Sequence, residues 1–172
     1  MTLLAATALN ANNQIVLLAF ALVPVENKEW WKWFLNFFGE AFDEGGINGE
    51  DCNVVFLSDR GKGLEMALNS EFPAAFHGMC VHHLSQNVKA RYSAHAASFT
   101  FKLARAKTRT AFELINAELE ASSAGAARYL NATDHSRWAR FAFPYPCFGH
   151  LTSNIAESLN AILSDTRRLP PI

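Results

Sequence analysis

Apolar residues occur along this chain both in short continuous runs, which predict strands, and at helical spacing, which predicts helices. Together they predict an α/β fold. The segments "TLLAATAL" (residues 2–9) and "QIVLLAFALV" (residues 14–23) are apolar runs joined by the turn-prone "NANN", which predicts a buried β-hairpin. The next segment, "ENKEWWKWFLNFFGEAF", carries apolar residues at helical spacing. We expect this helical stripe to pack in the core, with its members Trp30, Phe34, Phe37, Phe38 and Ala41. Glu26 and Glu29 stand near the expected helix start, where the helix dipole favours anions.

Strands and helices then alternate. "CNVVFLSD" (residues 52–59) is typical of a short strand buried on both faces, and "KGLEMALNSEF" (residues 62–72) of a short helix that Pro73 ends. "AAFHGMC" predicts another strand, and "HHLSQNVKARY" predicts the helix after it. The predicted order up to this point is ββαβαβα.

The rest of the chain is predicted to be mainly helical. Residues 93–141 carry one apolar stripe with Phe99 and Leu103 and another with Phe112 and Leu119. A Pro/Gly/aromatic connector, "FPYPCFG", precedes a last helix that begins at capping residues and stops at prolines. We therefore predict three parts, which are an α/β core segment over 1–92, a helical insertion over 93–141, and a connector with a final core helix over 142–172.

Composition and charge narrow the class of protein. Half of the 172 residues are hydrophobic, yet the longest apolar run, residues 15–25, is shorter than the roughly 20 residues that cross a bilayer. We expect no membrane contact. Three cysteines without a CxxC pair favour a reducing compartment. Residues 1–75 hold four Lys/Arg and ten Asp/Glu, a net of −6, whereas residues 76–172 hold eleven and six, a net of +5.

Two acids are placed for metal chemistry. Asp59 lies at the carboxyl end of a predicted strand, where open α/β sheets hold ligands, and Glu157 lies on the last helix, "NIAESLNAILSDTRR". Carboxylates of this kind hold Mg²⁺ or Mn²⁺ pairs about 3.5–4 Å apart in enzymes that cut or join DNA. On spacing alone, capping is the favoured interpretation of both acids, since Asp59 precedes a helix and Glu157 stands three residues after Asn154.

The polar face of the last helix offers groups for DNA. Asn160, Ser164 and Arg168 recur with Glu157 at steps of three or four residues, while Ile155 and its neighbours form the apolar side. Asn160 and Arg168 are therefore candidate DNA contacts.

Cationic residues of the second half suggest a second DNA contact. Lys102, Arg105 and Arg109, preceded by Lys89 and Arg91, fit a phosphate-binding face. They fit a solvated helical surface as well.

The segment "HGMCVHHL" contains a Cys-x-x-His pair, Cys80 and His83. Structural zinc takes four ligands, and with His77 as a third no fourth is evident in the sequence. We therefore expect a buried cysteine with hydrogen-bonded histidines, and zinc is the less favoured interpretation.

Four ordered segments resemble the catalytic region of Mutator-like element (MULE) transposases. These are "LLAATALNANNQIVLLAFALVPVENKEWWKWFL", "FLSDRGKGL", "FHGMCVHHLSQNV" and "TSNIAESLNAILSDTRRLPPI". The resemblance implies a ribonuclease H-like mixed sheet with an Asp, Asp, Glu triad and a helical insertion between the second Asp and the Glu. Asp59 matches the second acid, Glu157 the third, residues 93–141 the insertion, and Cys80 with His83 a family motif. Mg²⁺ or Mn²⁺, transposon-end DNA as partner, a nuclear location and homo-oligomerisation of the intact protein are further implications.

The first acid of the family triad has no match here. In the family it lies on a first strand upstream of the hairpin, and residues 1–25 contain no Asp or Glu; the hairpin turn carries Asn10. We therefore expect a sheet that lacks its first strand, from a truncated gene model or a decayed element, and a chain that is inactive alone. The alternatives are a transposase-derived non-catalytic DNA-binding or regulatory protein, and a remnant without present function.

Overall fold

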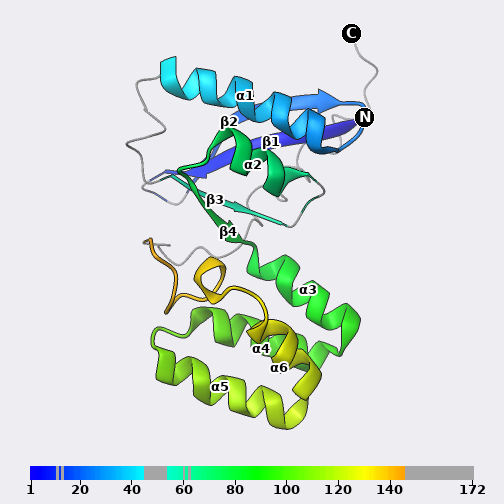
Figure 1. Cartoon of the computed structure of the whole chain (residues 1–172), viewed down its shortest axis with the longest axis vertical. Coiled ribbons are helices and arrows are strands. Elements are labelled where there is room, and N and C mark those ends of the chain that lie inside the picture. The colour runs from blue at the N-terminus through cyan, green and yellow to red at the C-terminus, as the bar shows by residue number, and fades with distance from the viewer. Residues whose placement is uncertain (11, 13, 45–53, 60, 62, 146–172) are drawn as a thin grey trace. The chain divides into compact units, whose positions relative to one another are not determined.

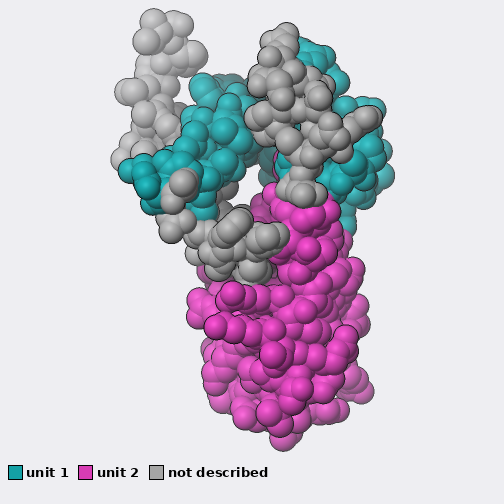
Figure 2. Space-filling view, turned by 90° about the vertical axis from the view of Figure 1, so that its left-hand side faces the viewer, with its two compact units in different colours: residues 1–54, 61–75, 153–172 teal, residues 55–60, 76–152 magenta. Residues whose placement is uncertain are grey.

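The computed structural model describes residues 1–10, 12, 14–44, 54–59, 61 and 63–145. Their order is β1 (Thr2–Leu9), β2 (Ile15–Val23), α1 (Lys28–Glu44), β3 (Val55–Ser58), α2 (Leu64–Glu71), β4 (Phe76–Met79), α3 (Val81–Arg91), α4 (Ala94–Arg105), α5 (Arg109–Ser122), α6 (Ala124–Asn131) and the 3₁₀ turn η1 (His135–Arg137) (Figure 1). The order ββαβαβα, followed by helices, is confirmed. The described elements form two compact units (Figure 2): β1, β2, α1 and α2 belong to the first, and β3, β4, α3 to α6 and η1 to the second.

The first unit begins with an antiparallel hairpin. Thr2 pairs with Val23 at the open end and Leu9 with Ile15 at the turn, with a register shift between Ala6 and Thr7. Asn10 shapes the turn, because its Oδ1 accepts from the Asn12 and Gln14 amides at 2.9 Å. The hairpin prediction is right, and the amide of Asn10 has a structural role of the kind that Asn commonly has in turns.

The burial predicted for the hairpin is wrong. Leu4 and Val23 are buried, but Phe20 is 63% exposed and Leu22 58% exposed. The other exposed large side chains of β2 are Ile15, Val16, Leu17 and Leu18. An apolar run predicts a strand, but the burial of its side chains depends on which other elements pack against each face of the strand. The sequence of the run itself does not specify those elements.

Helix α1 begins at an asparagine that the sequence analysis did not single out. Asn27 Oδ1 accepts from the Trp30 amide at 2.9 Å, which satisfies one of the open amides of the first turn. Glu26 accepts instead from the Trp31 indole at 3.1 Å. The expected helix is therefore confirmed, with Asn27 as its cap and Glu29 in its first turn.

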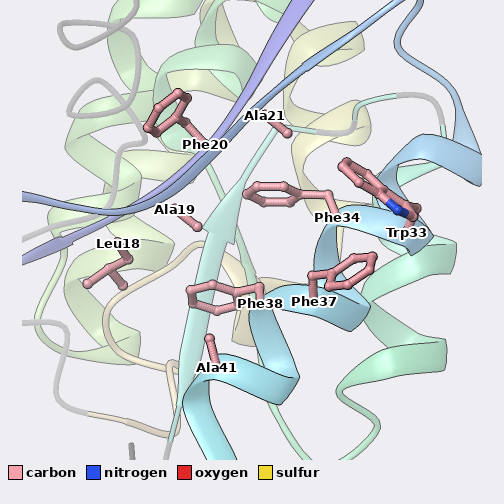
Figure 3. Close-up of a pocket in the computed structure, with 9 residues that line it drawn as sticks. All are labelled: Leu18, Ala19, Phe20, Ala21, Trp33, Phe34, Phe37, Phe38 and Ala41. Carbon is pink, nitrogen blue, oxygen red and sulfur yellow. The ribbon is translucent and has the colours of Figure 1, made fainter. Parts of the chain in front are cut away.

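The aromatic stripe of α1 is only partly buried. Phe34 and Phe38 are buried, whereas Phe37 is 54% exposed and Trp33 is 44% exposed. In Figure 3 the rings of Phe34 and Phe38 extend from α1 toward β2, where a groove of about 270 Å³ separates the two elements. The prediction that Phe37 packs in the core is wrong, because the rings cover a wider arc of the helix than β2 and α2 cover.

Helix α2 packs against α1 and begins at a glycine. The Phe38 and Phe72 rings lie 6.0 Å apart, and Lys32 pairs with Glu71 at 3.7 Å. Gly63 is the N-cap with φ of 87°, a left-handed conformation that glycine adopts readily. A side chain there would also collide with the Lys28 backbone, whose Cα would lie 2.4 Å from the added Cβ.

The second unit combines a small sheet with helices. β3 and β4 are parallel, with Val55 opposite Phe76 and Ser58 opposite Met79. All four residues of β3 are half-buried, so the prediction of a strand is confirmed but that of full burial is wrong. Within the described residues the chain therefore has two separate two-stranded sheets, one antiparallel and one parallel.

The helices of the second unit share one core. Ser93 caps α4 by accepting from the Ala96 amide, and Thr108 caps α5 by accepting from the Ala111 amide. Their apolar stripes belong to one buried cluster, which includes the fully buried Trp138. The predicted stripes are confirmed, because Phe99, Leu103, Phe112 and Leu119 are all buried in this cluster. No helix in the described ranges is long and apolar enough to span a bilayer.

Replacing Gly63 by alanine should lower the free energy of unfolding by about 2 kcal/mol or more, because the left-handed backbone and the Lys28 contact both oppose a Cβ. Urea unfolding followed by tryptophan fluorescence measures this. Gly39→Ala is the matched control, since its Cβ meets only the Phe72 ring at 3.4 Å and alanine favours a helix. Equal losses in the two variants would contradict the explanation.

His135 should make the stability of the second unit depend on pH. Burial lowers the pKa of His135 below its ordinary 6.5, which Arg109 reinforces and Asp134 opposes. The folded state then binds fewer protons than the unfolded state, so this contribution is complete above about pH 6.5 and is lost as pH falls below that value. We expect the free energy of unfolding to fall less steeply from about pH 7 to about pH 5 in His135→Phe than in the wild type. Equal slopes would show that His135 does not contribute.

Candidate functional site

The parallel pairing of β3 and β4 brings the ends of both strands to one edge. Asp59 directly follows β3 and Cys80 directly follows β4, and the Cys80 amide donates to the Ser58 carbonyl at 2.8 Å. Parallel strands end on the same side of a sheet, where open α/β sheets bind ligands. The strand-end position predicted for Asp59 is therefore present in the structure.

The Cys-x-x-His spacing has a geometric meaning at this edge. Cys80 is the N-cap of α3 and is 2% exposed, so its side chain faces the core. His83 lies one turn later, and its Nε2 is 3.9 Å from Asp59 Oδ2, with the two side chains 39% and 41% exposed. This distance is too long for a direct hydrogen bond, and an ion pair this exposed contributes little to stability. The start of α3 thus carries a buried Cys80 and, three residues later, a His83 side chain that lies near Asp59.

A small hollow lies between these groups. It has a volume of about 10 Å³, and its lining is Ser58, Asp59, Met79, Cys80, His83, Leu84 and Asn87. That volume accommodates roughly one water-sized group. Within the described part of the chain, no three side chains of His, Cys, Asp or Glu stand close enough to hold a metal ion together.

The ring of His77, the third candidate zinc ligand, lies against Ser58 and Arg137. Its Nε2 lies 2.7 Å from Ser58 Oγ, and its Nδ1 lies 3.1 Å from Arg137 Nη2. Both ring nitrogens thus face protein atoms. Arg137 was missed by sequence reasoning, because 60 positions separate it from His77 and no local motif links them.

The alternative that Asp59 caps the following helix is wrong. The N-cap of α2 is Gly63, four residues later, and it starts the helix through its left-handed backbone. The corresponding alternative for Glu157, a capping box with Asn154, lies outside the described residues, as do Glu157, Asn160, Ser164 and Arg168 themselves. A shared site of Asp59 and Glu157 stays a prediction.

The cationic candidates that precede the last helix, residues 89 to 109, lie at the surface of the second unit. Lys102 and Arg105 are exposed on α4, and Arg109 is exposed at the start of α5. Each lies over an aromatic ring, Lys102 over Phe99 at 4.8 Å, Arg105 over Phe101 at 5.7 Å and Arg109 over Phe141 at 5.4 Å. Arg91 lies similarly over Tyr129 at 4.9 Å. The rings support the side chains, whose charged ends stay accessible to an anionic partner.

Comparison with known proteins gives one family. The family model described as the MULE transposase domain matches residues 1–87, which is half of the chain and includes Asp59, Cys80 and His83. The comparison with curated proteins found no match to this chain.

Proposed function

Because this chain belongs to the MULE transposase domain family, we propose that it is part of a transposase catalytic domain that cuts and joins DNA by two-metal phosphoryl chemistry. Asp59 is the proposed ligand of Mg²⁺ or Mn²⁺. The single observation that carries this proposal is its position, half-exposed at the carboxyl end of β3 and beside the start of α3.

The proposed fold is ribonuclease H-like. An antiparallel hairpin followed by α1, β3, α2, β4 and α3, with β3 and β4 parallel, supports this proposal. The helices from α4 to α6 fit the insertion that the family resemblance implies between the second and third acids. The proposed core has one further strand, which in the family carries the first acid.

The chemistry needs more carboxylates than Asp59 alone. Two metal ions about 4 Å apart stabilise the attacking and leaving oxygens at a phosphate, and several carboxylates are needed to hold both ions. Glu157, which matches the third acid of the family triad, is our proposed second ligand, and residues 1–25 provide no acid for the first position of the triad. We therefore propose that this chain by itself binds one ion weakly and does not cleave DNA.

A second candidate function is DNA binding without catalysis. The observation that favours it is the exposed cationic side chains on α4 and α5, in a half of the chain with a net charge of +5. Phosphate contacts of this kind bind DNA without reading its sequence. Both functions have DNA as the partner and are consistent with a nuclear location; Asn160 and Arg168 remain candidate contacts in either.

Asp59→Asn should abolish Mn²⁺ binding by the full chain, because the amide keeps the shape of the side chain but lacks the charge that a divalent ion requires. Isothermal titration with Mn²⁺ measures the affinity. Glu118→Gln is the matched control, since it removes one negative charge from an exposed side chain on α5, outside the elements that hold Asp59. Binding that survives in Asp59→Asn would contradict the metal role of Asp59.

A nuclease assay with Mg²⁺ or Mn²⁺ should show no cleavage of duplex DNA by the chain alone. The physical reason is the incomplete set of carboxylates, which leaves the second ion unheld. Cleavage that Asp59→Ala abolishes would show that the first acid has been misplaced and that the chain is a complete enzyme.

Charge reversal at Lys102, Arg105 and Arg109 should weaken DNA binding and make it less sensitive to salt. If the three side chains contact phosphates, the slope of log affinity against log salt becomes shallower by about 3. Fluorescence anisotropy with duplex DNA at several salt concentrations measures it. The control exchanges Lys for Arg and Arg for Lys at the same positions, which keeps the charges and should keep the slope. An unchanged slope after reversal would exclude this surface as the DNA contact.

A further inference from the structure

Hydrogen bonds connect Arg137 to the backbone of Asp59 through two intermediate side chains. Arg137 Nε donates to the His77 carbonyl at 2.9 Å, and its Nη2 lies 3.1 Å from His77 Nδ1. His77 Nε2 lies 2.7 Å from Ser58 Oγ, which donates to the Asp59 carbonyl at 2.8 Å. We call this row of contacts the Arg137 bridge. It joins η1, β4 and the end of β3 within the second unit.

The donors and acceptors of the Arg137 bridge have one consistent arrangement. A guanidinium can only donate, so His77 Nδ1 must accept from Arg137. A neutral imidazole then carries its hydrogen on Nε2 and donates it to Ser58 Oγ. The Ser58 hydroxyl is left to donate to the Asp59 carbonyl, as its geometry shows. Every bond therefore points from Arg137 toward Asp59.

This direction excludes a different use of the Ser58 and His77 pair. A serine nucleophile needs a histidine nitrogen that accepts the hydroxyl proton, with the other ring nitrogen donating to an acceptor such as a carboxylate. Here the group at Nδ1 is a cationic donor, so Nε2 donates to Ser58 rather than accepting from it. The pair therefore has a structural role at the end of β3.

Two features make Arg137 hard to replace. Its planar fork contacts the carbonyl and the ring of His77 together, which the single ammonium of lysine cannot reproduce. Gly78, next to His77 on β4, lets this segment come close, because an added Cβ would lie 3.4 Å from the Arg137 carbonyl and 3.1 Å from the Phe143 ring. The local sequence thus allows a contact across 60 positions.

We propose that Arg137 is a positioning residue for Asp59. Through His77 and Ser58 it fixes the backbone at the end of β3, and so the direction in which the Asp59 carboxylate points. This proposal rests on the proposed function, because it is that function which gives the Asp59 carboxylate a metal to bind. It also assigns a task to η1, which follows the inserted helices and lies outside the residues matched by the family model.

The test compares Arg137→Gln, Arg137→Lys and Ser58→Ala in the full chain. Arg140→Gln is the matched control, as it removes the same charge from an exposed side chain three residues away. We expect the first three variants to weaken Mn²⁺ binding on the order of 10-fold, as changes around metal ligands commonly do. Ser58→Ala should weaken Mn²⁺ binding even though the contacts of Arg137 with His77 remain. The control should bind as the wild type does.

Two readouts that need no metal separate positioning from a loss of folding. Nitrogen NMR of ¹⁵N-labelled histidine should show His77 protonated on Nε2 in the wild type, and the Nδ1 signal should move in both Arg137 variants but not in Arg140→Gln. Amide exchange at Cys80, whose N–H donates to the Ser58 carbonyl, should speed up in all three bridge variants. Urea unfolding identifies any variant whose faster exchange reflects global unfolding, and Arg137→Lys and Ser58→Ala are the mildest changes.

The outcomes separate the two proposals. Mn²⁺ affinity and Cys80 exchange that stay at control values in Arg137→Gln and Ser58→Ala would overturn the positioning role. If instead Asp59→Asn binds Mn²⁺ as the wild type does, the metal function fails, while Cys80 exchange and the His77 signals still decide whether the Arg137 bridge holds the end of β3.

Discussion

The parallel pairing of β3 and β4 is the constraint on which the candidate site depends. Each strand has only four residues, and a sheet of two short strands is marginal by itself in water. The pairing is completed beyond the strands by the Cys80 amide on the Ser58 carbonyl, and α3 begins immediately after this bond. Because α3 then enters the core that includes Leu84, Val88 and Trp138, the helices of the second unit stabilise the strand ends. The position of Asp59 is thus a consequence of helical packing as much as of strand pairing.

Local signals in the sequence predicted the elements well, and the reasons are visible in the structure. Each strand is a short apolar run, and Ser93 and Thr108 cap helices in the way that their hydroxyls allow. Asp59 was placed at a strand end by the same reasoning. The alternative that Asp59 caps α2 is wrong because Gly63 is the N-cap of that helix, with a left-handed backbone and no side-chain acceptor.

Burial and long-range contacts were not predictable in this way. The rings of α1 repeat at helical spacing, but Phe37 and Phe34 share that pattern and only Phe34 is buried. Periodicity gives the direction of a side chain on its own helix, while the partner that covers it comes from another element. The contact of Arg137 with His77 has the same character, since it needs the register of β3 on β4 and the path of η1 before it can be seen.

The way in which the end of β3 is held suits a metal ligand. Ser58 Oγ donates to the main-chain carbonyl of Asp59, and the Cys80 amide donates to the main-chain carbonyl of Ser58, so these two bonds act on the backbone and use neither carboxylate oxygen. These two bonds fix the main chain from which the Asp59 side chain leaves. His83, at 3.9 Å from Oδ2, is close enough to limit where the carboxylate can turn and too far to hold it by a hydrogen bond. For the metal role that we propose for Asp59, a backbone fixed in advance reduces the conformational freedom that would be lost on binding an ion.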